Sequence, residues 1–97
     1  MEINLVRASE SSLQLAGSVR GRPSEKQGQY LAFIYYYTKI HREAPSEAEM
    51  QCYFGVTPPS VHQMVLSLAR NGFIERTPGK PRSIKLLLPR RELPDLE

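Results

Sequence analysis

Residues 46–70 carry the start and stop signals of two helices that follow each other across a tight turn. Ser46 and Glu49 have the spacing of a capping box, in which each side chain bonds the backbone amide of the other residue, so a helix is predicted to begin there. Gly55 supplies the residue that tolerates positive φ where this helix must end. The next helix signal comes only two residues later. Because so short a connection makes the helices cross steeply, the segment predicts a helix-turn-helix.

The second helix of the pair is predicted over residues 58–70. Thr57 is its N-cap, and Pro58 takes the first helical position, where a missing N–H costs nothing. Apolar residues recur every three or four positions and form the predicted buried stripe: Val61, Met64, Val65 and Leu68. The opposite side carries polar residues: Ser60, His62, Gln63 and Ser67.

A longer helix and a β-hairpin are predicted on either side of this pair. Ser24 and Gln27 form a second capping-box pattern, which opens a helix that runs to about Arg42. Residues 73–77 and 83–88 alternate with the period of strands and flank a turn rich in Pro and Gly. The fold class predicted is mainly α with a small β-hairpin, a three-helix winged helix-turn-helix. The apolar face of its first helix is predicted to contain Tyr30, Leu31, Phe33, Ile34, Tyr37 and Ile40.

The same punctuation divides the chain into a flexible leader (1–22), the winged domain (23–89) and a C-terminal tail (90–97). Its 97 residues suffice for one core of modest size. The one cysteine, Cys52, cannot form an internal disulfide, so a reducing compartment is expected. No apolar run approaches the roughly 20 residues that cross a bilayer, and the N-terminus lacks the order of a secretion signal. We therefore expect a cytoplasmic protein.

Charge is distributed unevenly along the sequence. The formal net charge is +3, but residues 20–91 contain 12 basic and 5 acidic residues. Between Arg70 and Arg91 there are 7 basic residues and one acid, Glu75. A basic folded part is what a phosphate-binding surface requires, although small soluble domains also carry such an excess on solvated faces.

Four stretches of the chain are specific in combination, although each alone is common among winged helices: residues 44–50 (APSEAEM), 54–61 (FGVTPPSV), 68–76 (LARNGFIER) and 82–87 (RSIKLL). Together they resemble the N-terminal DNA-binding domain of LexA repressors, over residues 24–88. The resemblance implies a DNA-binding transcriptional regulator, by family a repressor. LexA repressors also have a Ser–Lys peptidase domain that cleaves and dimerises them. Because this chain ends at Glu97, we expect a stand-alone domain without self-cleavage.

Double-stranded DNA as the partner defines two sets of contact residues. The major groove is about 12 Å wide and admits one helix, so helix 58–70 is predicted to read base edges there. Gln63 can bond adenine bidentately, and Pro59 can touch a thymine methyl. The predicted base-reading residues are Pro58, Pro59, Ser60, His62, Gln63 and Ser67. Phosphate contacts are predicted from the wing (77–83) and its surroundings: Lys26, Arg70, Lys80, Arg82 and Lys85, with the amides of Ser46 or Thr57.

Other functions fit the sequence less well. His41 and His62 lie on different predicted helices and Cys52 stands alone, so no metal site is expected. We expect no enzyme, no cofactor and no small-molecule ligand. One alternative stays open, a winged helix that docks on a partner protein without sequence-specific DNA binding, because fold does not determine function. Since one such module makes only a small DNA contact, we expect at most a weak homodimer or help from a partner protein.

Overall fold

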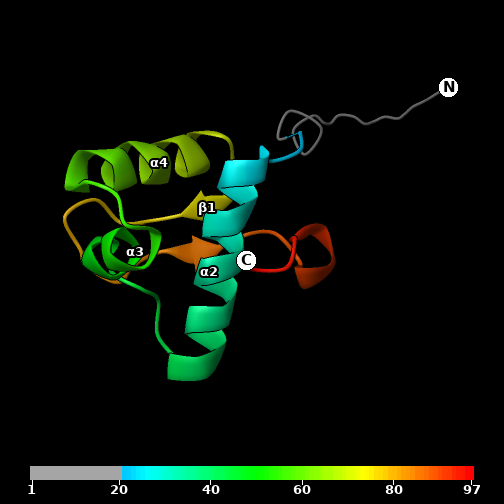
Figure 1. The fold of residues 1–97 in the computed structure, drawn as a ribbon, viewed down its shortest axis with the longest axis horizontal. Helices are drawn as coiled ribbons and strands as arrows, with labels where there is room; N and C mark the ends of the chain where they lie inside the picture. The colour runs from blue at the N-terminus through cyan, green and yellow to red at the C-terminus, as the bar shows by residue number, and fades with distance from the viewer. Residues whose placement is uncertain (1–20) are drawn as a thin grey trace, which may run out of the picture.

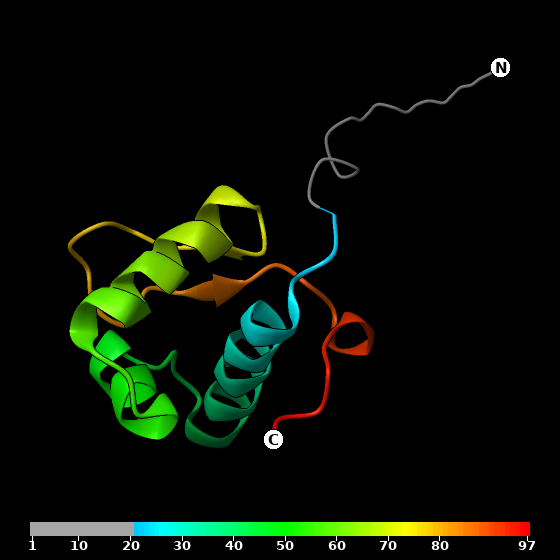
Figure 2. The ribbon, with the colours of Figure 1, turned by 45° about the horizontal axis from the view of Figure 1, so that its top comes forward.

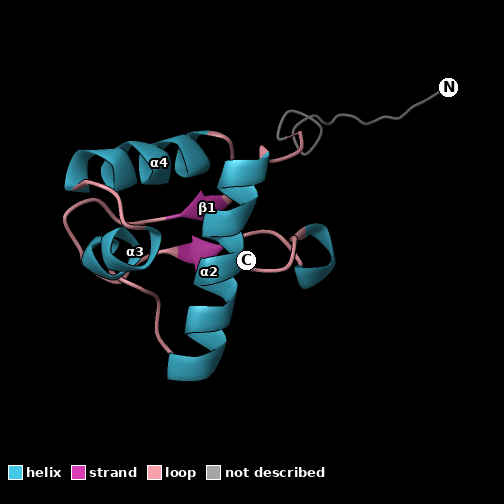
Figure 3. Ribbon diagram, in the orientation of Figure 1, coloured by secondary structure: helices cyan, strands magenta, loops and turns pink. Residues whose placement is uncertain are grey.

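The structure, a computed structural model, describes residues 21–97, so almost all of the leader predicted for residues 1–22 lies outside the described residues. Over the described residues, three helices precede a two-stranded antiparallel sheet and a short 3₁₀ helix (Figures 1 and 3). The predicted winged helix-turn-helix, mainly α with a small hairpin, is confirmed. In chain order the elements are α2 (Glu25–His41), α3 (Glu47–Phe54), α4 (Pro58–Arg70), β1 (Ile74–Glu75), β2 (Lys85–Leu86) and η1 (Arg90–Glu92).

The three helices begin where their caps predict. The Ser24 hydroxyl accepts from the Gln27 amide at 3.1 Å, and the Gln27 side chain accepts from the Ser24 amide at 2.9 Å. Ser46 and Glu49 make the same reciprocal pair at the start of α3. Thr57 caps α4 by accepting from the Ser60 amide at 3.3 Å. Each start therefore depends on residues only three positions apart.

Two glycines with positive φ end the motif helices. Gly55, at φ 66°, caps α3 and turns the chain toward α4. Gly72, at φ 79°, follows α4, and its amide donates to the Ala69 carbonyl at 3.0 Å. The Phe73 amide donates to the Leu68 carbonyl at 3.0 Å, which completes a Schellman motif. This ending directs Phe73 into the core and starts the hairpin.

The core lies where the three helices meet the hairpin. The rings of Tyr30 and Phe54 stack at a centroid distance of 4.0 Å, which joins α2 to α3. Ile40 does not belong to the core, and its predicted place on the apolar face of α2 was wrong, since 71% of its surface is exposed. The last turn of α2 extends past the elements that pack on it (Figure 1). The buried cluster contains Tyr30, Leu31, Ile34, Met50, Val61, Val65, Leu68, Phe73, Ile74, Leu88 and Leu93.

The hairpin is shorter than the alternating pattern predicts. Only two residue pairs form the sheet, Ile74 with Leu86 and Glu75 with Lys85. Beyond them, the Ser83 hydroxyl accepts from the Thr77 amide at 2.9 Å and contacts its carbonyl at 3.2 Å. The Ser83 side chain thus takes the place of backbone hydrogen bonds between the strands at Thr77. The prolines in the turn have no N–H and cannot donate such bonds. The predicted strands 73–77 and 83–88 were therefore too long.

Residues 90–97 pack on α2, so the expectation that they form a spare tail was wrong. Leu93 is only 6% exposed and belongs to the core cluster. The Arg90 guanidinium donates to the Tyr36 hydroxyl at 2.9 Å. Gly28 makes room for Pro94, because a Cβ at position 28 would lie 3.0 Å from the Pro94 Cγ. Figure 2 shows this segment returning beside α2.

No helix within residues 21–97 is both long enough and apolar enough to cross a membrane.

We predict that Leu93→Ala lowers the free energy of unfolding by about 2 kcal/mol, because it removes a buried side chain and leaves a cavity. Leu87→Ala is the matched control, since Leu87 is 39% exposed and should change stability by less than about 0.5 kcal/mol. Urea unfolding followed by circular dichroism measures both. Equal effects of the two substitutions would contradict the docked C-terminal segment.

Candidate nucleic-acid interface

Helix α4 separates an apolar side from a polar side. Val61, Val65 and Leu68 have no exposed surface, which confirms these residues of the predicted stripe, whereas Met64, its fourth member, is only half-buried. Ser60 and Gln63 are exposed on the other side. The outward side of α4 forms the surface of the molecule on one flank of the fold (Figure 1). A helix held in this way can enter a groove without disturbing the core.

The first turn of α4 offers side chains rather than backbone amides. Pro58 and Pro59 have no N–H, and Thr57 already accepts from the amide of Ser60. The first three helical positions therefore cannot bind phosphate through the backbone. The same holds for Ser46 at the start of α3, whose amide donates to the Glu49 carboxylate at 2.8 Å. The predicted phosphate contact of the Ser46 amide was wrong, because that N–H is used in its own capping box.

Helices α2 and α4 meet at a shallow depression on this face. Gln27 donates through Nε2 to the Ser67 hydroxyl at 3.0 Å, so Ser67 is half-buried and bridges the helices instead of standing free toward a base. The bridge brings the exposed Lys26 of α2 beside the polar side of α4, which carries Ser60 and Gln63. The lining residues are Lys26, Tyr30, Pro59, Ser60, Gln63, Met64 and Ser67.

A second depression lies between α4, the start of α3 and the wing. His62 places Nδ1 3.2 Å from the Glu47 carboxylate, so one side of its ring contacts α3. Lys80 and Arg76 line the same depression. A carboxylate on this side opposes phosphate, and the two bases of the hairpin offset it.

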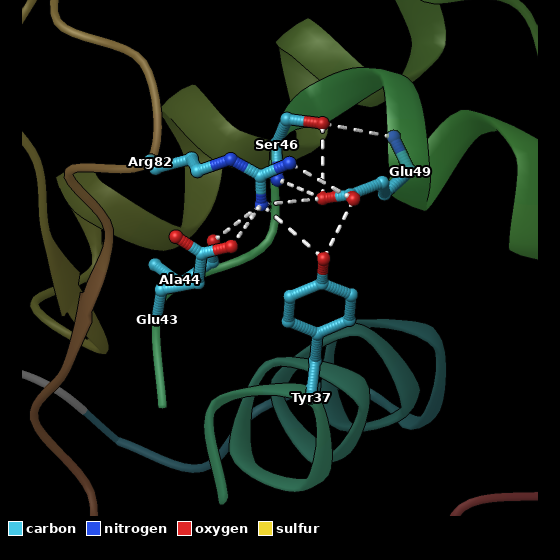
Figure 4. A network of polar contacts seen from close by, with 6 residues as sticks. All are labelled: Tyr37, Glu43, Ala44, Ser46, Glu49 and Arg82. Carbon is cyan, nitrogen blue, oxygen red and sulfur yellow. Dashed lines mark hydrogen bonds and ion pairs between the residues drawn. The ribbon is translucent and has the colours of Figure 1, made fainter. Parts of the chain in front are cut away.

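The Arg82 side chain points from the wing toward Glu49 at the start of α3 (Figure 4). Its guanidinium holds both oxygens of Glu49 at 2.9 and 3.0 Å, and it also donates to the Ala44 carbonyl at 3.0 Å and the Tyr37 hydroxyl at 3.2 Å. Arg82 therefore does not stand free at the wing tip, although 36% of its side chain stays exposed and it still lines the second depression. A bidentate arginine–carboxylate pair has two parallel charge-assisted hydrogen bonds, which favours this direction of the side chain.

Strong hydrogen bonds shift the titration of this network. The Arg82 guanidinium, the Ser46 amide and the Tyr37 hydroxyl together lower the pKa of Glu49 from 4.5 to about 2. The bonds of Arg82 to Glu49 and, to a smaller extent, to Tyr37 raise the pKa of Arg82. The bond to Glu49 also raises the pKa of Tyr37. The ion pair is thus fully charged at neutral pH and fastens the wing to the start of α3.

Comparison with known proteins agrees with this arrangement. The family model described as the LexA DNA binding domain matches residues 23–83. The chain belongs to this family. The LexA repressor of Thermosipho melanesiensis is 36% identical over 64 residues, which are 66% of this chain and 32% of that protein. The chain thus spans about a third of the length of this curated relative.

The predicted contact residues of the LexA-type domain fall into separate groups. The first depression brings together Pro59, Ser60, Gln63, Ser67 and Lys26, and the second brings together His62, Lys80, Ser46 and Arg82. Thr57 is an exposed cap beside the first group, and Arg70 is exposed at the end of α4. Lys85 borders a different depression, with Tyr35 and Lys39 of α2, so it is not brought to the reading face.

Two residues of the LexA-type domain were missed by sequence reasoning. Arg76 lines the second depression, and its place near the end of the predicted strand 73–77, beside the turn, was the available signal. Glu47 contacts His62 across 15 positions of sequence, a pairing that no local pattern indicates.

We predict that Arg82→Ala raises the pKa of Glu49 from about 2 toward its ordinary value of 4.5, because the largest cause of the shift is removed. A titration of the Glu49 carboxyl carbon by NMR measures this change. Lys80→Ala removes an exposed base two residues earlier and should leave the Glu49 titration in place. A Glu49 pKa that does not move in Arg82→Ala would refute the ion pair.

We also predict that this pair makes the domain sensitive to acid. The folded pKa of Glu49 lies below the value of 4.5, so the unfolded chain takes up the proton first as the pH falls. The stability that Glu49 contributes is present above 4.5 and is lost as the pH falls to about 2. Urea midpoints at a series of pH values should fall more steeply across this window in the wild type than in Glu49→Gln. Parallel curves would contradict the prediction.

Proposed function

We propose that this LexA-type domain acts as a DNA-binding transcriptional regulator, with α4 in the major groove and the wing beside the phosphate backbone. One observation carries the proposal. The exposed side of α4 offers Ser60 and Gln63 to a groove, while Lys26 and Lys80 flank this side from two other elements. This arrangement suits DNA binding. Side chains on the helix can read the base sequence, and the lysines on either side can bind phosphates and so orient the protein on the duplex.

The residues of this interface take different roles. Gln63 bonds adenine through both groups of its amide, Ser60 bonds a base edge and Pro59 packs on a thymine methyl. Lys26, Arg70 and Lys80 contact phosphates on either side of the groove. Arg82 acts as a positioning residue, since it fastens the wing to Glu49. No arginine reads the groove from the first turns of α4, which favours an operator with A·T pairs at the positions read directly.

A single domain of this size covers little DNA. Single modules bury roughly 600 to 1,000 Å² on DNA, which limits affinity and specificity. We therefore propose that a second copy or a partner protein adds to the contact, with only weak self-association of the domain itself.

Fluorescence anisotropy of the purified protein on a random pool of labelled duplexes tests the function. The pool is bound at two salt concentrations, and the retained DNA is then sequenced. Salt-sensitive binding with an enriched motif supports a sequence-specific regulator, because each phosphate neutralised adds about 0.9 to the slope of log affinity against log salt. A folded protein that binds no DNA at low salt would overturn the proposal and favour docking on another protein.

We predict that two substitutions in this interface affect DNA binding in different ways. Gln63→Ala should change base preference at one position, where a bidentate contact discriminates by about 1–3 kcal/mol. Lys80→Ala should weaken binding to all sequences alike and lower the salt slope by about 0.9, because it removes a phosphate contact.

Lys39→Ala is the control for charge, since Lys39 lies in the last turn of α2, away from α4. Binding curves on the selected site and on single-base variants measure all three substitutions. A uniform effect of Gln63→Ala, or none, would contradict the assigned base contact.

A further inference from the structure

A groove runs along one edge of the two-stranded sheet. It lies between residues 82–86, which lead into β2, and the second half of α2, from which Ile34, Tyr35 and Lys39 line it. Among the described residues, none of α4 lines this groove. Because α4 packs against β1 and α2 packs against β2, the groove lies on the side of the sheet away from α4 (Figures 1 and 3). We call it the edge groove.

One wall of the edge groove is an open strand edge. The Leu87 amide donates to the Phe73 carbonyl at 2.9 Å. In an antiparallel pair every second residue bonds the partner strand, so the amide and carbonyl of Leu86, one residue earlier, point away from β1. Over the described residues the sheet has no third strand. An open edge of this kind is a template for one more strand.

The side chains beside this edge divide into an apolar and a basic set. Ile84 and Leu86 are partly buried against the core, and Ile34 of α2 belongs to the core cluster itself. Lys85 lies between the first two in sequence and is exposed, as the alternation of a strand requires. Lys39 is exposed on α2. The edge therefore has an apolar face toward α2 and a basic face toward solvent.

The charge of the edge groove is positive. Lys39, Arg82 and Lys85 line it, and none of the described residues that line it is acidic. Arg82 is already paired with Glu49 at 2.9 Å. Lys39 lies 5.6 Å from the centre of the Tyr35 ring, and neither Lys39 nor Lys85 pairs with a carboxylate within residues 21–97. A second copy of the chain would bring the same positive charges to the contact, whereas an acidic partner would complement them.

We propose that the edge groove binds an extended segment of a partner protein in which apolar and acidic residues alternate. The segment adds a strand to β2, and its backbone bonds the outward amide and carbonyl of Leu86. Its side chains point alternately to the two faces of the strand. Apolar ones pack beside Ile34 and Ile84, and acidic ones meet Lys85 across the new pair. This binding does not require the DNA binding proposed above.

The open part of the edge is short. At the wing end the Ala44 carbonyl accepts from the Arg82 guanidinium at 3.0 Å, which leaves residues 84–86 open. Three residues of strand span about 10 Å. Few backbone bonds can form over this length, so the bound segment depends on its acidic and apolar side chains as well.

A display library of short random peptides, selected on the purified protein, tests this docking site. Enriched peptides should alternate apolar and acidic residues over at least three positions. A library that gives no enriched peptide, or only peptides without acidic residues, would overturn the proposal.

Substitutions of basic residues locate the bound peptide. Lys39→Gln with Lys85→Gln should weaken the binding of an enriched peptide by about fivefold, because two exposed ion pairs are lost. Lys80→Gln with Arg91→Gln is the matched control, since it removes the same charge from the wing and from η1. Fluorescence anisotropy of the labelled peptide measures both. An equal loss in the two double variants would overturn the docking site, because net charge alone would then explain the binding.

Hydrogen exchange tests the added strand. The Leu86 amide should exchange with solvent about tenfold more slowly in the complex. The Leu87 amide is already bonded to Phe73 and should change little. An unchanged Leu86 amide would overturn the added strand. Protection of this amide that rises with the concentration of the protein alone would overturn the partner protein in favour of a second copy.

N-methylated forms of the enriched peptide test its backbone. Only every second amide of a strand faces the neighbouring strand. Methylation of one set of alternate amides should therefore abolish binding, and methylation of the other set should preserve it. Equal effects of the two methylated peptides would overturn strand addition.

Discussion

Helix α4 is held by a stripe of three side chains, Val61, Val65 and Leu68, which the core buries completely. Full burial of such a side chain contributes roughly 1.5–3 kcal/mol, which is large beside the net stability of about 5–15 kcal/mol that a typical domain has. A helix is rigid, and the side that is buried therefore determines the side that is exposed. Ser60 and Gln63 therefore face outward because the opposite side of α4 is packed in the core.

Several polar residues near this face are already bonded within the protein. Arg82 holds Glu49, Ser67 accepts from Gln27, and His62 contacts Glu47. Because these side chains are bonded within the protein, fewer side chains on this face are free to contact bases or phosphates. They also fix the wing and α2 relative to α4 before any partner arrives, which reduces the ordering that binding must impose. Charge-assisted bonds suit this purpose, because they are shorter and stronger than neutral ones.

Helix α2 connects the two sides of the domain. On one side its first turn is tied to α4 through Gln27 and Ser67. On the other side Gly28 admits Pro94, and Arg90 donates to Tyr36. The C-terminal segment thus adds Leu93 to the core on one side of α2, while the other side of α2 is bonded to α4. A change that loosens α2 would therefore also disturb α4, because α2 contacts both α4 and the C-terminal segment.

Most of the fold could be predicted from the sequence, because its signals act over three or four residues. The caps at Ser24, Ser46 and Thr57, the glycine turns and the stripe of α4 each depend on near neighbours. What the sequence alone did not determine depends on distant pairs. Arg82 meets Glu49 across 33 positions, Gln27 meets Ser67 across 40 and Arg90 meets Tyr36 across 54. Only packing brings such residues together, so only the tertiary structure decided which basic side chains are tied up within the protein and that residues 90–97 pack on α2 with Leu93 in the core.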